Sequence, residues 1–351
     1  MRSFDYSTLK EKTWDHEIIS LIAQIHEYKG RQEVYLKQKP EELNKLVEIA
    51  KRQSTEASNA IEGIRTTNAR LKELCEEKTT PKNRDEEEIL GYRDVLNTIH
   101  ENYEYIPIRT NYILQLHRDL YKYTEKSIGG HFKISQNVIA AIDRNRKEYI
   151  LFTPLAPYET TPAMDAICES YNKMIENDEL DAILLIPIFI HDFLCIHPFS
   201  DGNGRMSRLL TALLLYRSGY VVGKYISIES KIANNKDLYY KVLEDCQSGW
   251  YENDEDVTPF VKYMLRIILA AYRDFEERVE LVSEKLPAKE MVRRAIYSKM
   301  GKLSKSDISE LCPSIGVKSV ELALKQLVDE GVLEKKGLGR ATFYIRKDIN
   351  L

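Results

Sequence analysis

Apolar residues recur at spacings of three and four through the first 125 residues, and this periodicity most limits what the chain can fold into. Two such series are Leu43, Leu46, Val47 and Ala50, and Ile113, Leu116 and Leu120. The spacing predicts amphipathic helices. Only 15 glycines and 11 prolines occur in 351 residues, so few positions interrupt the pattern. The polar segment 78–84, which contains Pro81, predicts a break between two helices.

Residues 129–158 have a different character. A Gly-Gly pair, β-branched residues and a charged tip at 143–147 predict a β-hairpin, here called the flap, on an otherwise helical body. Helices are expected to resume with Thr161 as an N-cap and to continue to about residue 284. The acidic run 85–88 is interpreted as the solvated start of a helix.

The last 66 residues predict a separate domain. Their pattern is helix, turn, helix and two short strands around 335–340, which is typical of a winged helix. From 286 to 351 there are 13 Lys/Arg and 8 Asp/Glu, whereas the whole chain has a net charge of −4. With a seam at Pro287, we expect domains at 1–100, 101–285 and 286–351.

Composition excludes several other classes of protein. The five cysteines are scattered and form no CxxC pair, which favours reduced thiols over a disulfide framework or a structural zinc site. The polar N-terminus is unlike a signal peptide, and the longest apolar run, 182–190, is too short to span a bilayer. We therefore expect a cytoplasmic protein that does not enter a membrane.

The segment 197–208, HPFSDGNGRMSR, combines the residues of an anion-binding site. A helix is expected to end near Ile196 and another to begin near Asn203, with a glycine-rich turn between them. Backbone N–H groups at such a helix N-terminus bind anions. Arg205 and Arg208 share a helix face and suit a polyphosphate, Asp201 offers a hard oxygen ligand for Mg²⁺, and His197 at the rim suits a general base.

This segment fits the Fic family signature HxFx(D/E)GNGRxxR at every fixed position. The likeness extends to GGHFKISQNVIAAI and YILFTPLAPYETTPAM, which resemble the family's flap, and to YYKVLEDCQSGW, which resembles the segment that closes its nucleotide pocket. The resemblance implies a mainly α fold with a Fic catalytic core at 101–285 and a small β-hairpin flap. The helical N-terminal region and winged-helix tail resemble the layout of one bacterial subclass.

The resemblance implies a protein adenylyltransferase, a nucleotidyltransferase that moves AMP from ATP to a Ser, Thr or Tyr hydroxyl of a target protein and of itself. His197 would be the catalytic base and Asp201 the Mg²⁺ ligand. The nucleotide would be bound by Gly202, Asn203, Gly204, Arg205, Arg208, Tyr240 and Gln247. A target protein would lie on the flap, residues 129–158, as an added strand.

A second pattern, SNAIEG at 58–63, resembles the family's inhibitory motif (S/T)xxxE(G/N). Ser58 and Glu62 are four residues apart on one helix face, and Gly63 is a natural helix stop. The resemblance implies that Glu62 pairs with Arg208 and so displaces the γ-phosphate from its partner.

Other functions stay open at this point. Glu62 could instead support the removal of AMP, and some relatives transfer a different phosphate-containing group. A nucleotide-sensing DNA-binding regulator is the rival from another class, but Glu321, Asp329 and Glu330 on the expected recognition helix do not favour DNA. The sequence also leaves a homodimer open. The His191-Asp192 pair is interpreted as structural rather than metal-binding, because no further spaced ligands accompany it.

Overall fold

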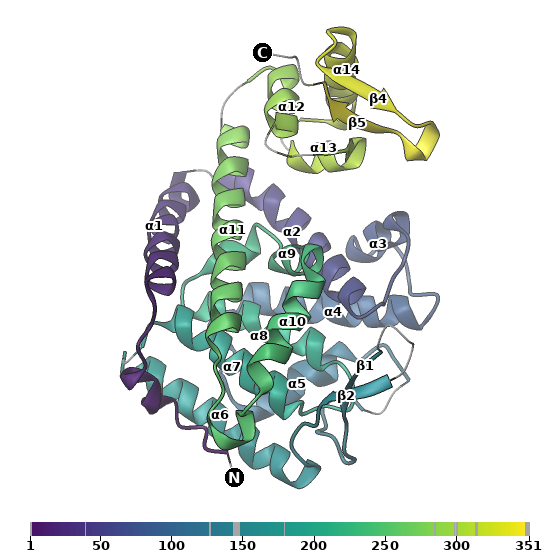
Figure 1. The fold of residues 1–351 in the computed structure, drawn as a ribbon. Helices are drawn as coiled ribbons and strands as arrows, with labels where there is room; N and C mark the ends of the chain where they lie inside the picture. The colour runs from purple at the N-terminus through teal and green to yellow at the C-terminus, as the bar shows by residue number, and fades with distance from the viewer. Residues whose placement is uncertain are drawn as a thin grey trace. The chain divides into compact units, whose positions relative to one another are not determined.

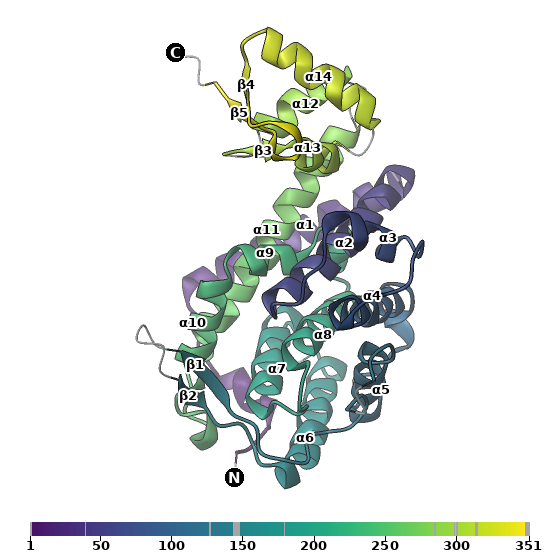
Figure 2. The same ribbon diagram turned by 90° about the vertical axis from the view of Figure 1, so that its right-hand side faces the viewer.

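The protein was analysed as a computed structural model, which describes residues 2–38, 40–125, 128–142, 148–178, 180–283, 286–297, 299, 301–312 and 315–347. The described residues are mostly helical, with a small β-hairpin, so the predicted fold class is confirmed (Figures 1 and 2). In these ranges, no helix has both the length and the apolar character needed to cross a membrane.

The helices begin with α1 (His16–Gln38), α2 (Pro40–Ile61), α3 (Asn68–Cys75), α4 (Arg84–Asn102), α5 (Thr110–Leu120), α6 (Pro157–Glu176) and α7 (Ala182–Ile196). They continue with α8 (Asn203–Arg217), α9 (Ile228–Asn234), α10 (Lys236–Gln247), α11 (Thr258–Ser283), α12 (Ala288–Tyr297), α13 (Lys305–Leu311) and α14 (Val317–Asp329). The strands are β1 (Ile139–Ile142), β2 (Glu148–Phe152), β3 (Leu303–Ser304), β4 (Leu333–Lys336) and β5 (Phe343–Arg346). Short 3₁₀ segments are η1 (Tyr6–Glu11), η2 (Tyr103–Tyr105), η3 (Val221–Lys224), η4 (Trp250–Glu252) and η5 (Gly339–Ala341).

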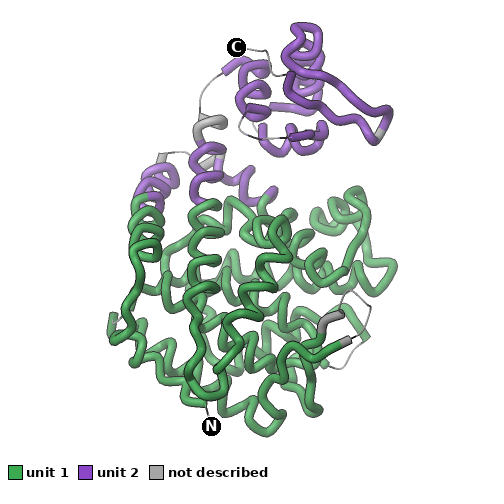
Figure 3. The backbone as a smooth tube through the Cα atoms, in the orientation of Figure 1, with its two compact units in different colours: residues 1–27, 50–271 green, residues 28–49, 272–351 purple. Residues whose placement is uncertain are grey.

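The chain divides into two compact units (Figure 3). The first comprises residues 1–27 and 50–271, and the second comprises residues 28–49 and 272–351. Helices α1, α2 and α11 each contribute residues to both units. The boundaries expected at 100 and 285 stay predictions.

Helix α7 forms the centre of the first unit. It is apolar on all sides, and every residue from Ile183 to Ile196 is buried, as expected for a helix enclosed by others. It packs against α6 and α8, while α4 packs against α5 and α8. This arrangement places the segment between α7 and α8, residues 197–202, where several helices meet.

Local predictions in this unit are mostly confirmed. The predicted break at 78–84 falls in the interval between α3 and α4 except for Arg84, which begins α4. Helix α7 ends at Ile196, and α8 begins at Asn203. The expected start of a helix at Thr161 is wrong: α6 begins at Pro157, because proline is well suited to the first helical position. The predicted flap therefore runs two residues into α6. Strands β1 and β2 pair antiparallel within it, and its charged tip at 143–147 lies outside the described residues.

The second unit contains the expected C-terminal elements. Helices α13 and α14 are followed by the two predicted strands around positions 335–340: β4 includes Lys335 and Lys336, and β5 follows at Phe343. A two-residue strand that the sequence did not indicate, β3, completes an antiparallel sheet of order β3-β5-β4. The buried core of these C-terminal elements contains residues of α12, α13 and α14, including Val292, Ile308, Val320, Leu324 and Leu327.

Candidate active site

A cavity of about 920 Å³ in the first unit brings together most of the predicted site residues. Its lining comes from the end of α2, the start of α8, helix α10 and both flap strands. The predicted residues that line it are Glu62, His197, Asp201, Gly202, Asn203, Gly204, Arg205, Arg208, Tyr240 and Gln247.

The turn between α7 and α8 is held in a defined shape. His197 takes a left-handed backbone conformation with φ 50°, which ends α7. The Asn203 side chain bonds in both directions to Phe199, accepting from its N–H at 2.9 Å and donating to its carbonyl at 2.7 Å. Gly202 has φ +83°, and a Cβ there would lie 2.9 Å from Tyr121 Oη. Glycine is therefore required both by the backbone conformation and by the close approach of Tyr121.

His197 is arranged to accept a proton. Its Nδ1 lies 3.2 Å from the Leu194 carbonyl, which can only accept, so Nδ1 carries the hydrogen and Nε2 holds the lone pair. The pKa of this imidazole is lowered to about 4, mainly by burial and also by the charge of nearby Lys133, although the hydrogen bond to the Leu194 carbonyl raises it. Glu62 acts in the opposite direction. The ring is consequently neutral near pH 7, which is the state that a general base requires.

The start of α8 offers an anion site that already faces a carboxylate. The first N–H groups of a helix have no partner within the helix, and no side chain caps α8. A Cβ on Gly204 would lie 2.2 Å from Glu62 Oε1. The Glu62 carboxylate therefore packs directly against the first turn of α8, where negative charge is favoured.

Arg208 connects α8 to the end of α2. Its Nη2 donates to Glu62 Oε1 at 2.7 Å and to the Ser58 carbonyl at 2.9 Å, and its Nε donates to Ser58 Oγ at 2.8 Å. The guanidinium is 3% exposed, whereas Glu62 is 31% exposed toward the cavity. Ser58 and Glu62 of the SNAIEG pattern thus both contact Arg208. A third residue of the pattern, Gly63, ends α2.

Gly63 ends α2 in a way that places Glu62. The Ile64 N–H bonds to the Asn59 carbonyl and the Gly63 N–H to the Ala60 carbonyl, with Gly63 at φ +82°. These two bonds with a left-handed glycine are a Schellman motif. Glu62 is the residue just before that glycine, so the motif directs the chain away immediately after the carboxylate.

Arg205 is buried against a partner that the sequence analysis missed. Its Nη2 lies 2.7 Å from Glu88 Oε2, with both side chains at most 2% exposed, and 2.8 Å from Tyr121 Oη. Its Nε and Nη1 are buried without a hydrogen-bond partner among the described residues. Buried orphan donors on a cation that lines a cavity are what an anionic ligand would satisfy.

The interpretation of 85–88 as a solvated helix start is half wrong. Helix α4 does begin there, with Asn83 as its N-cap. Glu86 and Glu88, however, are buried because each pairs with an arginine, Arg70 and Arg205 respectively. No local pattern marks these two residues, because residues two apart in a helix do not share a face.

Asp201 fits a magnesium ion that is shared with a substrate. Its Oδ1 accepts from the Gly202 N–H at 2.7 Å, and its Oδ2 lies 4.0 Å from Arg84 Nη2. Within the described ranges, no group of three His, Cys, Asp or Glu residues could hold a metal. Mg²⁺ commonly uses one or two carboxylates together with substrate phosphates, so the single carboxylate is compatible with it.

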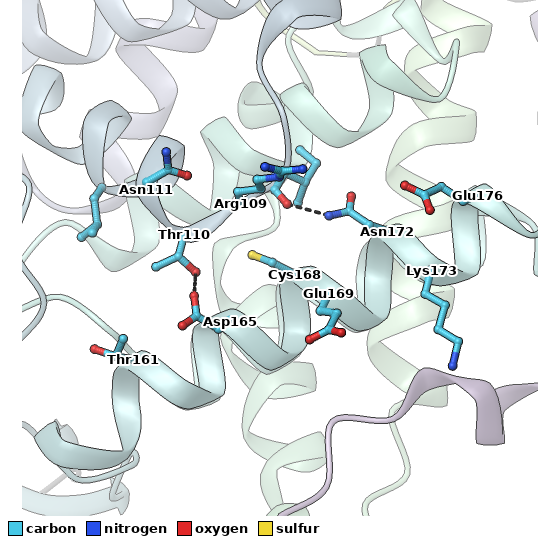
Figure 4. Close-up of a pocket in the computed structure, with 12 residues that line it drawn as sticks. Arg109, Thr110, Asn111, Thr161, Asp165, Cys168, Glu169, Asn172, Lys173 and Glu176 are labelled. Carbon is cyan, nitrogen blue, oxygen red and sulfur yellow. Dashed lines mark hydrogen bonds between the residues drawn. The ribbon is translucent and has the colours of Figure 1, made fainter.

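A second cavity, of about 740 Å³, lies between α5 and α6 and contains none of the motif residues (Figure 4). Two hydrogen bonds lie within its lining: Asn172 donates to the Ile108 carbonyl at 2.8 Å, and Thr110 bonds to Asp165. Burial raises the pKa of the Cys168 thiol to about 12, so the thiol stays protonated. These features do not resemble a catalytic site.

The His191-Asp192 pair is buried within α7, and its structural role stays a prediction. Asp192 is 1% exposed and accepts hydrogen bonds from Tyr6 Oη at 2.9 Å and Trp250 Nε1 at 2.7 Å. It also forms an ion pair of 2.7 Å with Arg2. These partners tie the first residues of the chain to α7.

Comparison with known proteins shows what this part of the chain is similar to. Residues 107–215 match the model of the Fic/DOC family. The match covers less than half of the chain and includes the 197–208 motif.

Curated relatives support the same classification. A Fido domain-containing protein of Dictyostelium discoideum is 27% identical over 148 residues, which cover 42% of this chain and 96% of the relative. A Drosophila yakuba protein named protein adenylyltransferase Fic is 29% identical over 211 residues, and one of that name from Nematostella vectensis is 24% identical over 218. The aligned parts cover 59–60% of this chain but only 38–45% of those two relatives.

Solved structures share the fold. A Fic family protein from Desulfovibrio desulfuricans superimposes with a TM-score of 0.62 and 21% identity, over 97% of this chain and 98% of that one. A Fic domain containing signaling protein from Bacteroides thetaiotaomicron gives a TM-score of 0.61 and 24% identity, over 77% and 100%.

Proposed function

We propose that this chain is a protein adenylyltransferase that transfers AMP from ATP to a hydroxyl group of a target protein and of itself. The observation that carries the proposal is the single cavity that holds a neutral histidine beside a helix N-terminus with two buried arginines. A base and a polyphosphate site are thus side by side. The relatives named protein adenylyltransferase support this reaction over transfer of another group.

In this mechanism, Nε2 of His197 accepts the proton of the target hydroxyl while its oxygen attacks the α-phosphorus of ATP. A new phosphorus–oxygen bond forms to the target, the bond between the α-phosphorus and the bridging oxygen breaks, and pyrophosphate leaves. The N–H groups of Asn203 and Gly204 and the orphan donors of Arg205 stabilise the charge on the phosphates. Arg208 would bind the γ-phosphate, and Tyr240 and Gln247 would contact the adenosine.

Asp201 would hold Mg²⁺ beside the phosphates. When bound, the ion would neutralise phosphate charge and orient the leaving group. The Gly202 N–H fixes one oxygen of Asp201 and leaves the other turned toward Arg84.

The resting enzyme is autoinhibited by Glu62. The Glu62 carboxylate occupies the partner, Arg208, that the γ-phosphate needs, and it lies against Gly204 in the anion site. ATP would then bind in a pose unsuited to in-line attack. Because Glu62 is partly exposed in the same cavity as His197, it could also hold a water that removes AMP. Incubation of an AMP-modified target with wild-type protein tests that reverse reaction.

The C-terminal elements support a winged-helix module that docks a protein partner. Their order and the sheet β3-β5-β4 agree with that fold. On α14, Val317 and Leu322 are more than half exposed, and Leu338 between β4 and β5 is 90% exposed. These apolar side chains suit a protein surface better than DNA phosphates. A salt-dependent gel shift with the full chain tests this assignment, and specific retention of duplex DNA would contradict it.

The test of the proposed reaction is transfer of label from ATP that is labelled in its α-phosphate, followed by mass spectrometry of the protein. Wild type, Glu62→Gly and Glu62→Gly with His197→Ala form the set. We expect strong labelling of the second only. Absence of labelling in all three, with a host lysate supplied as target, would overturn the proposal.

A further inference from the structure

The turn that carries His197 is held from outside by the flap stem, residues 129–138, which leads into β1. Two stem residues, Lys133 and Asn137, donate hydrogen bonds to the carbonyl oxygens of four consecutive residues, 196–199. Neither residue belongs to the HPFSDGNGRMSR motif. The motif's first turn therefore takes its shape partly from a segment some 60 residues earlier in the chain.

Lys133 contributes two of these bonds. Its Nζ donates to the Ile196 carbonyl at 3.0 Å, and its backbone N–H donates to the Pro198 carbonyl at 2.9 Å. The side chain is 3% exposed, and burial lowers the pKa of the ammonium to about 8. Burying an ammonium is costly unless its donors are satisfied. The acceptor at the C-terminus of α7 suits it, because that end of a helix carries partial negative charge.

Asn137 contributes the other two bonds. Its Nδ2 donates to the carbonyls of His197 at 3.3 Å and Phe199 at 3.1 Å. Lys133 Nζ donates to Asn137 Oδ1 at 2.9 Å, and this bond directs the amide nitrogen toward the turn. The two side chains thus act as one clamp.

The clamp supports a backbone that is otherwise disfavoured. A left-handed conformation at a non-glycine residue is strained and persists only when its surroundings hold it. His197 has this conformation, and its ring orientation depends on the bond from Nδ1–H to the Leu194 carbonyl. The clamp holds the backbone carbonyl of His197, to which Asn137 donates.

We propose that Lys133 and Asn137 are positioning residues for adenylyl transfer, which hold His197 with Nε2 available to the target hydroxyl. This inference rests on the proposed function. The stem continues into β1, and Ile139 of β1 lines the cavity. The same segment would therefore position both the base and a target that binds to the flap.

The kinetic test uses Glu62→Gly as the active parent and adds Lys133→Met or Asn137→Ala. Gln136→Ala is the matched control, because Gln136 Nε2 donates to the backbone carbonyls of Pro154 at 2.8 Å and Asn137 at 3.0 Å rather than to the turn. We expect kcat to fall about 10- to 100-fold with an unchanged KM for ATP, since small misplacements of a catalytic group cost rates of this order. Neither change should lower the rate further once His197→Ala is present. A kcat within twofold of the Gln136→Ala control would overturn the proposal.

A second measurement does not depend on activity. Histidine labelled with ¹⁵N shows which ring nitrogen of His197 carries hydrogen, and resonances are assigned by their loss in His197→Ala. We expect one tautomer, protonated on Nδ1, in the parent and in Gln136→Ala, and a mixture in Lys133→Met and Asn137→Ala. If both variants kept the parent's tautomer, the clamp would be excluded. An inactive parent would instead overturn the proposed function, while these spectra would still decide the role of the clamp.

Discussion

Glu62 Oε1 and Arg208 Nη2 lie 2.7 Å apart although 146 residues separate them in sequence. The Ser58 hydroxyl and carbonyl accept two further bonds from the same guanidinium. Arg208 is buried, so removal of Glu62 leaves a cation that needs another anion. In the proposed function, a nucleotide phosphate meets this requirement, and the end of α2 is thereby linked to nucleotide binding.

Arg208 should be necessary for the gain produced by loss of Glu62. We expect Glu62→Gly to raise the adenylylation rate, and Arg208→Ala to stay slow with or without Glu62→Gly, because the γ-phosphate still lacks its partner. A double-mutant cycle on initial rates should therefore be strongly non-additive. Full rescue of Arg208→Ala by Glu62→Gly would show that the pair does not act through the phosphate.

His197→Ala in the Glu62→Gly background should abolish transfer while leaving ATP binding nearly unchanged. The imidazole lies at the turn before the anion site, and loss of a general base costs about 10²–10⁴ in rate. Isothermal titration with ATP gives the binding constant, and label transfer gives the rate. A variant that transfers AMP at the parent's rate would exclude this residue as the base.

Arg205→Ala and Asp201→Ala should both weaken productive use of Mg·ATP, because each removes a charge partner of the triphosphate. We expect the Asp201→Ala defect to show mainly in titrations that contain Mg²⁺, and the Arg205→Ala defect to show with and without it. If binding and turnover were unchanged in both variants, the assigned roles would be wrong.

Glu88→Gln should destabilise the fold, because it leaves the buried Arg205 without its counterion. Loss of one partner of a buried pair costs about 3–5 kcal/mol. In the Glu62→Gly background, pyrophosphate should restore part of the lost thermal stability, since its charge can replace the carboxylate. A melting temperature that is equal to the parent's, with no added response to pyrophosphate, would contradict the role given to this pair.

Acid should destabilise the protein through its buried histidines. Burial lowers the pKa of His100 to about 3 and of His191 to about 4, whereas the unfolded chain titrates near 6.5. Between these values the unfolded state binds more protons, so the free energy of unfolding falls as pH falls below about 6.5. Each histidine contributes up to about 2 kcal/mol between pH 6.5 and 5.

Urea unfolding between pH 7.5 and 5 measures this dependence. We expect the midpoint to decrease toward pH 5, and His100→Gln to reduce the slope because it removes one titrating group while retaining a partner for Tyr216 Oη. A midpoint that does not change over this range would show that the buried histidines do not titrate as described.

The sequence predicted the parts of the site that depend on local chemistry. The helix ends at Ile196 and Asn203 follow from apolar periodicity and the glycines between them, and both are where the structure has them. The SNAIEG pattern likewise contained its own helix stop, Gly63. The proximity of Glu62 and Arg208 came instead from the family resemblance, since no local pattern pairs residues so far apart.

Long-range partners could not be predicted in this way. In the sequence, Glu88 is one of several acidic residues at a helix start. Its pairing with Arg205 depends on the packing of α4 against α8. Lys133 and Asn137 lie in a stem without helical or strand periodicity, so nothing in their spacing indicates four carbonyl acceptors on another segment. The start of α6 was misplaced because Thr161 suits an N-cap, whereas Pro157, four residues earlier, opens the helix.

The central claim is that Glu62 inhibits adenylyl transfer by this protein. The most direct test compares the initial rates at which wild type and Glu62→Gly transfer label from ATP labelled in its α-phosphate. Both proteins are assayed with Mg²⁺ and the same host lysate, with Glu62→Gly/His197→Ala as the blank. We predict a rate for Glu62→Gly at least tenfold above wild type, with wild type near the blank. Equal labelling of wild type and Glu62→Gly would contradict autoinhibition and leave the 58–63 segment as an ordinary helix end.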